Sequence, residues 1–273
     1  METVSCPICY NDKLESISTK GQFGFTTNVV ICPNDGMVFL SPRWDRNTYK
    51  EFYRKEYAKF YRRTINNSIS SYVLNTRLNS MKLIKDRMSI LEIGAGMGNN
   101  LACIGDTHDL DLELHAIEAS EQCMSHLVNR GITLIANSAE SLDAVDKYDL
   151  IILRHVFEHF LSPELMLDKI YTALKPGGAL YIAVPDMMNP SGSLDRHWFR
   201  VVHTHYYSRE TLLYMLSRSI FYRNVLYNEN HELWGVFTKM RYKGTYINNV
   251  YEEQMKVIKK QKFKSIFYNL IRR

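Results

Sequence analysis

The stretch Leu91-Glu92-Ile93-Gly94-Ala95-Gly96-Met97-Gly98 decides the fold of this 273-residue chain. The apolar run 89–93 predicts a short buried strand. The three glycines that follow let the backbone turn sharply and approach a ligand without interference from a Cβ atom. A strand that passes through such a turn into a helix is typical of nucleotide-binding sheets.

Outward from this turn, strands and helices alternate. We expect further strands at 112–117, 132–135, 148–153 and 179–184, helices at 120–130, 163–174 and 209–219, and a late pair of strands at 222–227 and 233–242. The run Lys175-Pro176-Gly177-Gly178 is a strong helix-end signal. The alternation predicts an α/β fold, with a Rossmann-like, mostly parallel, seven-stranded sheet and an antiparallel edge.

Three residues indicate which ligand the turn holds. The dinucleotide fingerprint needs a third glycine where this chain has Asn99, which argues against a nicotinamide dehydrogenase. Glu92, before the first glycine, would attract the ammonium of an amino acid and repel a pyrophosphate. Glu118 closes the second strand, where an acid contacts both ribose hydroxyls. The alternative for Glu118 is a solvated charge at a strand end.

Five motifs in this order resemble those of the class I methyltransferases that use S-adenosylmethionine (SAM). They span about residues 85–240 and comprise Leu91–Gly98, Glu118, Asn137–Glu140, Tyr148–Ile152 with Arg154–His159, and Leu174–Gly178. The resemblance implies SAM as the cofactor, bound by Glu92, Gly94, Ala95, Gly96, Gly98, Glu118, Ala119, Ser138, Ala139, Glu140, Arg154 and His155. The family often has Asp at position 138, so the adenine contact is expected from Ser138, the Ala139 backbone or Glu140.

The segment after the fourth strand bears on the substrate. Methyltransferases of nucleobase or amide nitrogens often carry Asn/Asp-Pro-Pro-Tyr there, whereas Arg154-His155-Val156-Phe157 resembles the small-molecule branch. The N-terminal segment, ending in Phe39-Leu40-Ser41-Pro42-Arg43, resembles that of bacterial enzymes associated with surface polysaccharides. The resemblance implies O-methylation of a sugar, nucleotide-sugar or related metabolite. The alternatives are C- or N-methylation and a non-catalytic SAM- or nucleotide-binding module.

Histidines gather near the expected mouth of the sheet. His203 and His205 follow the fifth strand, and His155 follows the fourth. O-methylation removes a proton from a hydroxyl, and imidazole titrates near neutral pH, so these three are the candidate catalytic residues. His203 and His205 are expected to share a face of an extended segment. The alternative for each is a structural hydrogen bond.

The cysteines predict a metal site. Cys6, Cys9, Cys32 and Asp35 form two knuckles, with Asp35 where a full zinc ribbon has a fourth cysteine. Three thiolates and a carboxylate suit a structural zinc. The alternative is a degenerate ribbon held by packing alone.

The sequence predicts four regions. They are a zinc-ribbon-like knuckle (1–44), a helical lid or linker (45–87), a SAM-binding domain (88–248) and a basic C-terminal helix (249–273). The aromatic spacing of 45–87 fits either a lid over the cofactor or a stripe packed on the core.

The net charge of +5 comes from the C-terminal tail. Residues 255–273 carry seven Lys/Arg and no Asp/Glu, which leaves 27 basic against 29 acidic residues elsewhere, a net charge of about −2. No nucleic-acid groove is therefore expected. The tail is expected either to pack or to dock weakly on an anionic membrane surface. With no apolar span and no signal-peptide pattern, a cytoplasmic location is expected.

Overall fold

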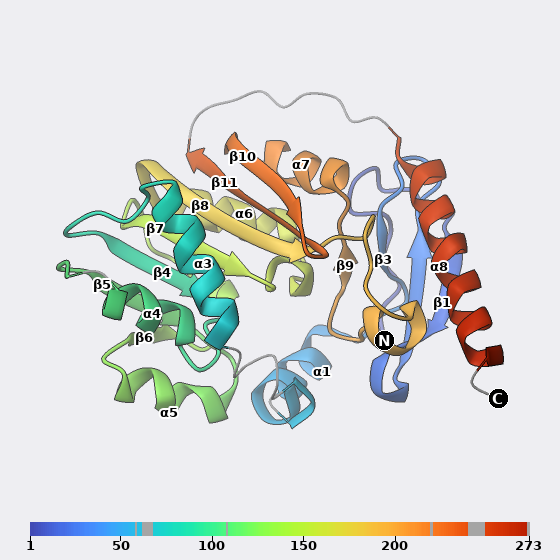
Figure 1. The fold of residues 1–273 in the computed structure, drawn as a ribbon, viewed down its shortest axis with the longest axis horizontal. Coiled ribbons are helices and arrows are strands. Elements are labelled where there is room, and N and C mark those ends of the chain that lie inside the picture. Colours follow the sequence, from blue (N-terminus) through green and yellow to red (C-terminus); the bar gives the residue numbers. More distant parts are fainter. Residues whose placement is uncertain (58, 62–67, 108, 219–220, 240–248, 272–273) are drawn as a thin grey trace.

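A seven-stranded sheet forms the larger part of the fold (Figure 1). The computed structural model describes residues 1–57, 59–61, 68–107, 109–218, 221–239 and 249–271. In spatial order, the strands are β10 (Phe221–Glu229), β11 (Glu232–Lys239), β8 (Leu174–Pro185), β7 (Tyr148–Arg154), β4 (Ser89–Ile93), β5 (Glu113–Ile117) and β6 (Thr133–Ala136). Only β11 runs against the direction of the other six strands, so the predicted Rossmann-like sheet with an antiparallel edge is confirmed.

Helices cover both faces of this sheet. One face carries α3 (Ser68–Ser80), α4 (Asn99–Thr107) and α5 (Glu121–Asn129), and the other carries α6 (Pro163–Ala173) and α7 (Arg209–Arg218). Along β7, Leu150 and Ile152 pack with the first set, whereas Ile151 and Leu153 pack with the second. Burial on both faces explains why these strands read as continuous apolar runs.

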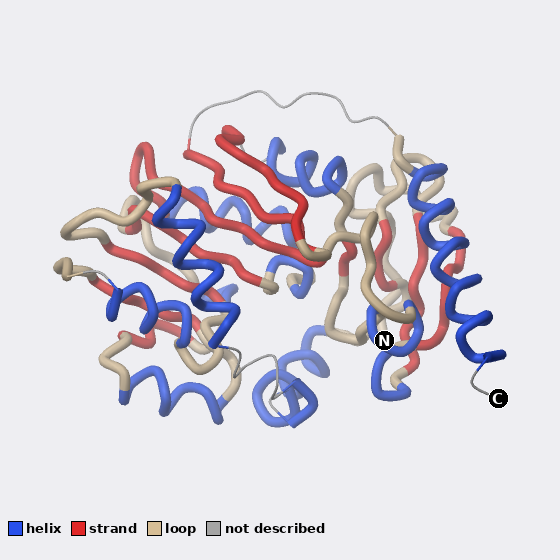
Figure 2. Tube along the Cα trace, viewed as in Figure 1, coloured by secondary structure: helices blue, strands red, loops and turns tan. Residues whose placement is uncertain are grey.

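A smaller antiparallel sheet stands beside the larger one (Figure 2). Its strands are β1 (Glu15–Lys20), β2 (Thr26–Ile31), β3 (Val38–Leu40) and β9 (His205–Tyr206), with the short helix η1 (Gln22–Gly24) between β1 and β2. The sequence assigned only residues 1–44 to this unit, but its fourth strand comes from the chain after β8. Pairing with β9 covers the edge that β3 would otherwise expose.

The C-terminal helix α8 (Tyr251–Ile271) packs on the small sheet. Ile258 is buried among apolar side chains of β1, β2 and β3, and the Gln254 side chain donates a hydrogen bond to the Gly36 carbonyl (2.6 Å). The side chains of residues 266–271 lie outside the described part of the chain. Docking of the basic residues on an anionic surface stays a prediction. Among the described helices, none has both the length and the apolar character needed to cross a membrane.

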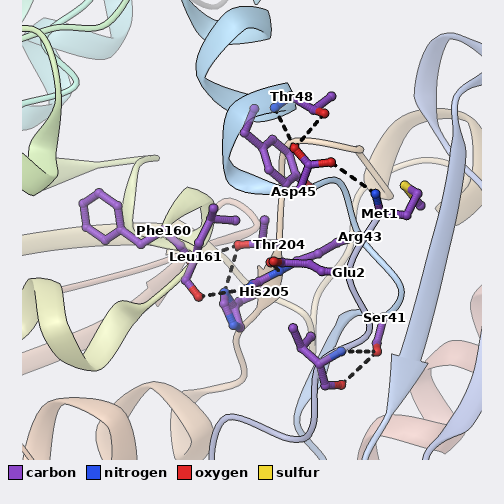
Figure 3. Close-up of polar contacts among 12 residues, drawn as sticks. Met1, Glu2, Ser41, Arg43, Asp45, Thr48, Phe160, Leu161, Thr204 and His205 are labelled. Carbon is purple, nitrogen blue, oxygen red and sulfur yellow. Dashed lines mark hydrogen bonds and ion pairs between the residues drawn. The ribbon is translucent and has the colours of Figure 1, made fainter.

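The N-terminal segment is tied to the large sheet by Arg43 (Figure 3). Arg43 Nε donates to Glu2 Oε1 (2.8 Å), and its Nη2 donates to the Leu161 carbonyl (3.1 Å) in the loop after β7. Asp45 then caps helix α1 (Arg46–Glu51) by accepting from the Thr48 amide (3.0 Å). These contacts place α1 and η2 (Phe52–Glu56), a π-helical turn, beside the carboxyl ends of the central strands.

Candidate active site

A cavity of about 850 Å³ opens where the parallel strands end. Ligands bind at this edge of open α/β sheets. Most of the predicted cofactor residues line the cavity, namely Gly94, Ala95, Gly96, Glu118, Ala119, Ser138, Ala139, Glu140, Arg154 and His155. Glu92 and Gly98 do not reach its wall.

The backbone requires glycine at two positions of the loop after β4. Gly94 has a φ of +71°, and a Cβ atom there would collide with Val156. Gly98 has a φ of +74°, and a Cβ atom there would lie 2.7 Å from Leu127 and 2.8 Å from Ile132. Gly98 therefore allows the first turn of α4 to pack closely, while Gly94 keeps the wall of the cavity open.

Glu118 holds the glycine loop from the end of β5. Its carboxylate accepts hydrogen bonds from the backbone amides of Gly96 and Ser120, both at 2.7 Å. Burial raises the pKa of Glu118, although these amides act in the opposite direction. The carboxylate lines the cavity and is positioned to accept hydroxyl groups of a ribose.

Glu92 lies behind the cavity wall. Asn100, on the wall, donates a hydrogen bond to Glu92 Oε1 (2.5 Å). The second oxygen, Oε2, is buried and has no hydrogen-bond partner among the described residues. Burial raises the pKa of Glu92 to about 8. A buried acid with a vacant oxygen suits the cationic amino-acid end of SAM better than a pyrophosphate.

Three tyrosines, from α1, from η2 and from the residue after η2, form another part of the cavity wall. Tyr49, Tyr53 and Tyr57 recur every four residues and line the cavity. Phe52, on the other side of the same turn, is buried against Tyr61 and Val202. The aromatic stripe therefore serves both roles that the sequence left open, since one side packs on a core and the other covers the cavity.

His155 is held by a buried acid that the sequence did not single out. Its Nε2 lies 2.6 Å from Glu232 Oε2 on β11, and Arg77 and Arg154 pair with the same carboxylate. Burial alone would lower the pKa of His155, but the nearby carboxylate of Glu158 and the contact with Glu232 raise it to about 9. His155 also has a φ of +54°, a strained conformation for a non-glycine residue. Such strain is common at functional sites.

The structure separates His203 from His205. His203 lies in a turn, where its amide bonds the Arg200 carbonyl (3.1 Å), and it lines the cavity. His205 begins β9 and stacks on Tyr207, away from the cavity lining. The expectation that both histidines face the cavity is wrong for His205, because strand β9 begins at this residue and its ring packs on Tyr207. Burial, then the charge of Arg43, lowers the pKa of His205 to about 3.

Glu158 and His159 also line the cavity. They belong to η4 (Phe157–His159), the turn directly after β7. Glu158 is 1% exposed, and neither of its carboxylate oxygens has a hydrogen-bond partner among the described residues. His159 Nδ1 lies 2.8 Å from the Tyr53 hydroxyl. Both residues belong to a motif that the sequence analysis recognised, but nothing in the sequence predicts that Tyr53 and His203 lie beside them.

The four predicted zinc ligands come together at the tip of the small sheet. Cys9 and Cys32 have their sulfurs 3.4 Å apart, and Cys6 Sγ lies 3.2 Å from Asp35 Oδ2. All four ligand atoms lie within 4.8 Å of one another. Asp35 Oδ1 accepts from the Met37 amide (2.8 Å), which orients the carboxylate.

Comparison with known proteins agrees with this geometry. A family model described as a methyltransferase domain matches residues 49–219. The chain therefore belongs to this family, and it is a SAM-dependent methyltransferase. No curated protein matches it in sequence.

Two solved structures show the same fold at low identity. The 1,6-didemethyltoxoflavin-N1-methyltransferase of Burkholderia thailandensis aligns with a TM-score of 0.55 and 14% identity, over 75% of this chain and 96% of that one. A SAM-dependent methyltransferase from Methanosarcina mazei aligns with a TM-score of 0.50 and 12% identity, over 59% of this chain and 97% of that one.

Proposed function

We propose that this enzyme methylates a hydroxyl group of a sugar, nucleotide-sugar or similar metabolite, and that it serves the synthesis of a bacterial surface polysaccharide. The observation that carries the proposal is the composition of the acceptor side of the cavity. Tyr53, Tyr57, His159, Arg200 and His203 stand there together. Flat aromatic rings beside several hydrogen-bonding groups suit a ligand with many hydroxyls.

The proposed chemistry is direct transfer in line with the departing sulfur. SAM, when bound, supplies the methyl group on its sulfonium. The glycine loop and Glu118 orient the cofactor, with Glu92 acting from behind the wall through Asn100, while the tyrosine wall orients the acceptor and excludes water. An imidazole on the cavity wall assists loss of the hydroxyl proton, and His203 is the first candidate, because the raised pKa of His155 keeps that ring protonated near neutral pH. His205 has a structural role in this arrangement. Its Nδ1 lies 2.9 Å from the Thr204 hydroxyl, and its ring does not line the cavity.

A screen of acceptors tests the proposal. Nucleotide-sugars and polysaccharide fragments are incubated with the enzyme and SAM, and products are analysed by mass spectrometry. We expect a gain of one methyl group in a sugar, with the ether carbon identified by NMR. A product methylated on carbon or nitrogen contradicts O-methylation. If no product forms with any acceptor while SAM still binds, a non-catalytic SAM-binding role replaces the proposal.

We also propose that Cys6, Cys9, Cys32 and Asp35 bind one structural zinc. Their spacing suits tetrahedral coordination, in which sulfurs bound to one zinc lie a little under about 4 Å apart. The side-chain amides of Asn11 and Asn34 approach the sulfurs of Cys32 and Cys9 at 3.8 and 3.9 Å. Such N–H groups orient and stabilise bound thiolates.

Substitution of one ligand tests the zinc. Cys9→Ser should lose about one zinc per chain and expose the small sheet to trypsin, because metal binding and local folding are coupled. Cys103→Ser, on α4 and outside the cluster, is the matched control and should keep the metal. Zinc is measured by atomic absorption on untagged protein. Equal zinc contents in the two variants would reject the site.

A further inference from the structure

The strongest unexplained feature of the cavity is the carboxylate of Glu158. It is buried with both oxygens unpartnered by hydrogen bonds among the described residues. A buried carboxylate without hydrogen bonds is costly, and the raised pKa of His155 supplies a cation only at 3.8 Å, beyond hydrogen-bond reach. Three imidazole nitrogens surround its Oε1, those of His155 and His159 at 3.8 Å and that of His203 at 3.9 Å. These distances are too long for hydrogen bonds.

Tyr53 orients the His159 ring. The Tyr53 hydroxyl lies 2.8 Å from His159 Nδ1 and 3.3 Å from the Val202 carbonyl. The Val202 carbonyl can only accept, so when the hydroxyl donates to it, Nδ1 of His159 donates to Tyr53. In that tautomer the Nε2 atom, 3.8 Å from Glu158 Oε1, is unprotonated and free to bind a cation together with the carboxylate.

Thr204 fixes the third member of the group. Its hydroxyl bonds the backbone carbonyls of Glu158 (3.0 Å) and Phe160 (3.1 Å), as Figure 3 shows for Phe160. This contact joins the turn after β7 to the segment that carries His203. The ligand atoms of Glu158, His159 and His203 consequently lie within 4.8 Å of one another.

We propose that Glu158, His159 and His203 bind a divalent first-row transition metal ion that holds the acceptor oxygen. Two ligand atoms that each lie about 2.1–2.4 Å from one ion are separated by about 3.0–3.9 Å, and Glu158 Oε1 lies at the upper end of this range from His159 Nε2 (3.8 Å) and His203 Nε2 (3.9 Å). Two imidazoles favour a transition metal over Mg²⁺ or Ca²⁺, which prefer oxygen ligands. Three protein ligands leave positions open for a substrate.

The role of the ion rests on the proposed function. A hydroxyl bound to the metal loses its proton more easily, and the proton leaves to solvent through the open cavity. The oxygen–methyl bond then forms as the sulfur–methyl bond of SAM breaks, which yields a methyl ether and neutral S-adenosylhomocysteine. His203 would act as a ligand in this arrangement, and the metal would replace it in assisting proton loss.

Titration with Mn²⁺ tests the site without reference to activity. Untagged protein that keeps its zinc is dialysed against buffer without added metal or chelator and titrated with Mn²⁺ while free Mn²⁺ is followed by electron paramagnetic resonance. We expect one saturable site that Glu158→Gln weakens at least about tenfold. Glu113→Gln, at the exposed start of β5, is the matched control and should bind as the wild type does. Equal binding by Glu158→Gln and wild type overturns the proposal.

A second variant addresses folding. Tyr53→Phe removes only the hydroxyl that orients His159, and we expect it to weaken Mn²⁺ about 10- to 100-fold, as loss of such an outer contact typically does. Unchanged binding in this variant contradicts the assignment of His159. Binding of Mn²⁺ by a protein that methylates no acceptor would retain the site and reject the proposed function. Methyl transfer at full rate after metal removal would retain the proposed function and reject the metal's role.

Discussion

His203→Ala should reduce the turnover number with a true acceptor by about 10²–10⁴-fold, which is the typical contribution of a positioned proton acceptor. His203 lies on the cavity wall, and its Nε2 is directed toward Glu158. The loss is expected whether the imidazole removes the proton itself or holds an ion that makes the hydroxyl more acidic, because either role acts on the acceptor hydroxyl. The affinity for SAM, measured by calorimetry, should stay unchanged, since the glycine loop and Glu118 remain intact.

Two other histidines serve as comparisons for His203. His126→Ala, on the exposed side of α5, should leave turnover unchanged. His205→Ala should lower thermal stability more than turnover, because His205 is buried away from the cavity lining and contacts Thr204 and Tyr207. If His203→Ala retains more than a tenth of wild-type turnover, the proton is removed elsewhere, and His155 becomes the first residue to replace.

Glu118→Ala should weaken SAM and S-adenosylhomocysteine together. Hydrogen bonds to a charged group contribute about 1.5–3 kcal/mol, so loss of the ribose contact lowers both affinities by about 10- to 100-fold. The effect should be equal for the two ligands because they share the same ribose. The variant also frees the amides of Gly96 and Ser120, which the carboxylate holds at 2.7 Å. Loosening of the glycine loop adds to the loss.

The control for Glu118 comes from the same strand. Glu113→Ala removes an exposed acid at the start of β5 and should change neither affinity. Calorimetric titration of both ligands into both variants gives the comparison, with thermal melting to confirm that each variant is folded. An affinity in Glu118→Ala within about twofold of wild type, a difference worth less than about 0.5 kcal/mol, would contradict the ribose contact.

Local signals in the sequence determined the sheet and the cofactor half of the cavity. The apolar run 89–93, the glycines and the acid Glu118 are close in sequence, and each acts through backbone geometry at its own position. The parallel character of the sheet follows from alternating strands and helices, because crossover helices join parallel strands, whereas the order of the strands is seen only in the structure. The observed ends of some strands differ from the predicted ends where pairing with a neighbour extends the strand. Strand β8, for example, starts at Leu174 and not at the predicted residue 179.

Only the tertiary structure decided the acceptor half of the cavity. Tyr53, Glu158, His203 and Glu232 come from four distant segments, and no local pattern states which of them meet. His203 and His205 show the reason most clearly. Their spacing predicts a common face only for an extended chain, whereas pairing of His205 with Phe39 in β3 and the turn before it set the two rings apart. Near a turn, the direction of a side chain depends on how elements remote in sequence pack against it. Local periodicity in the sequence does not predict that packing.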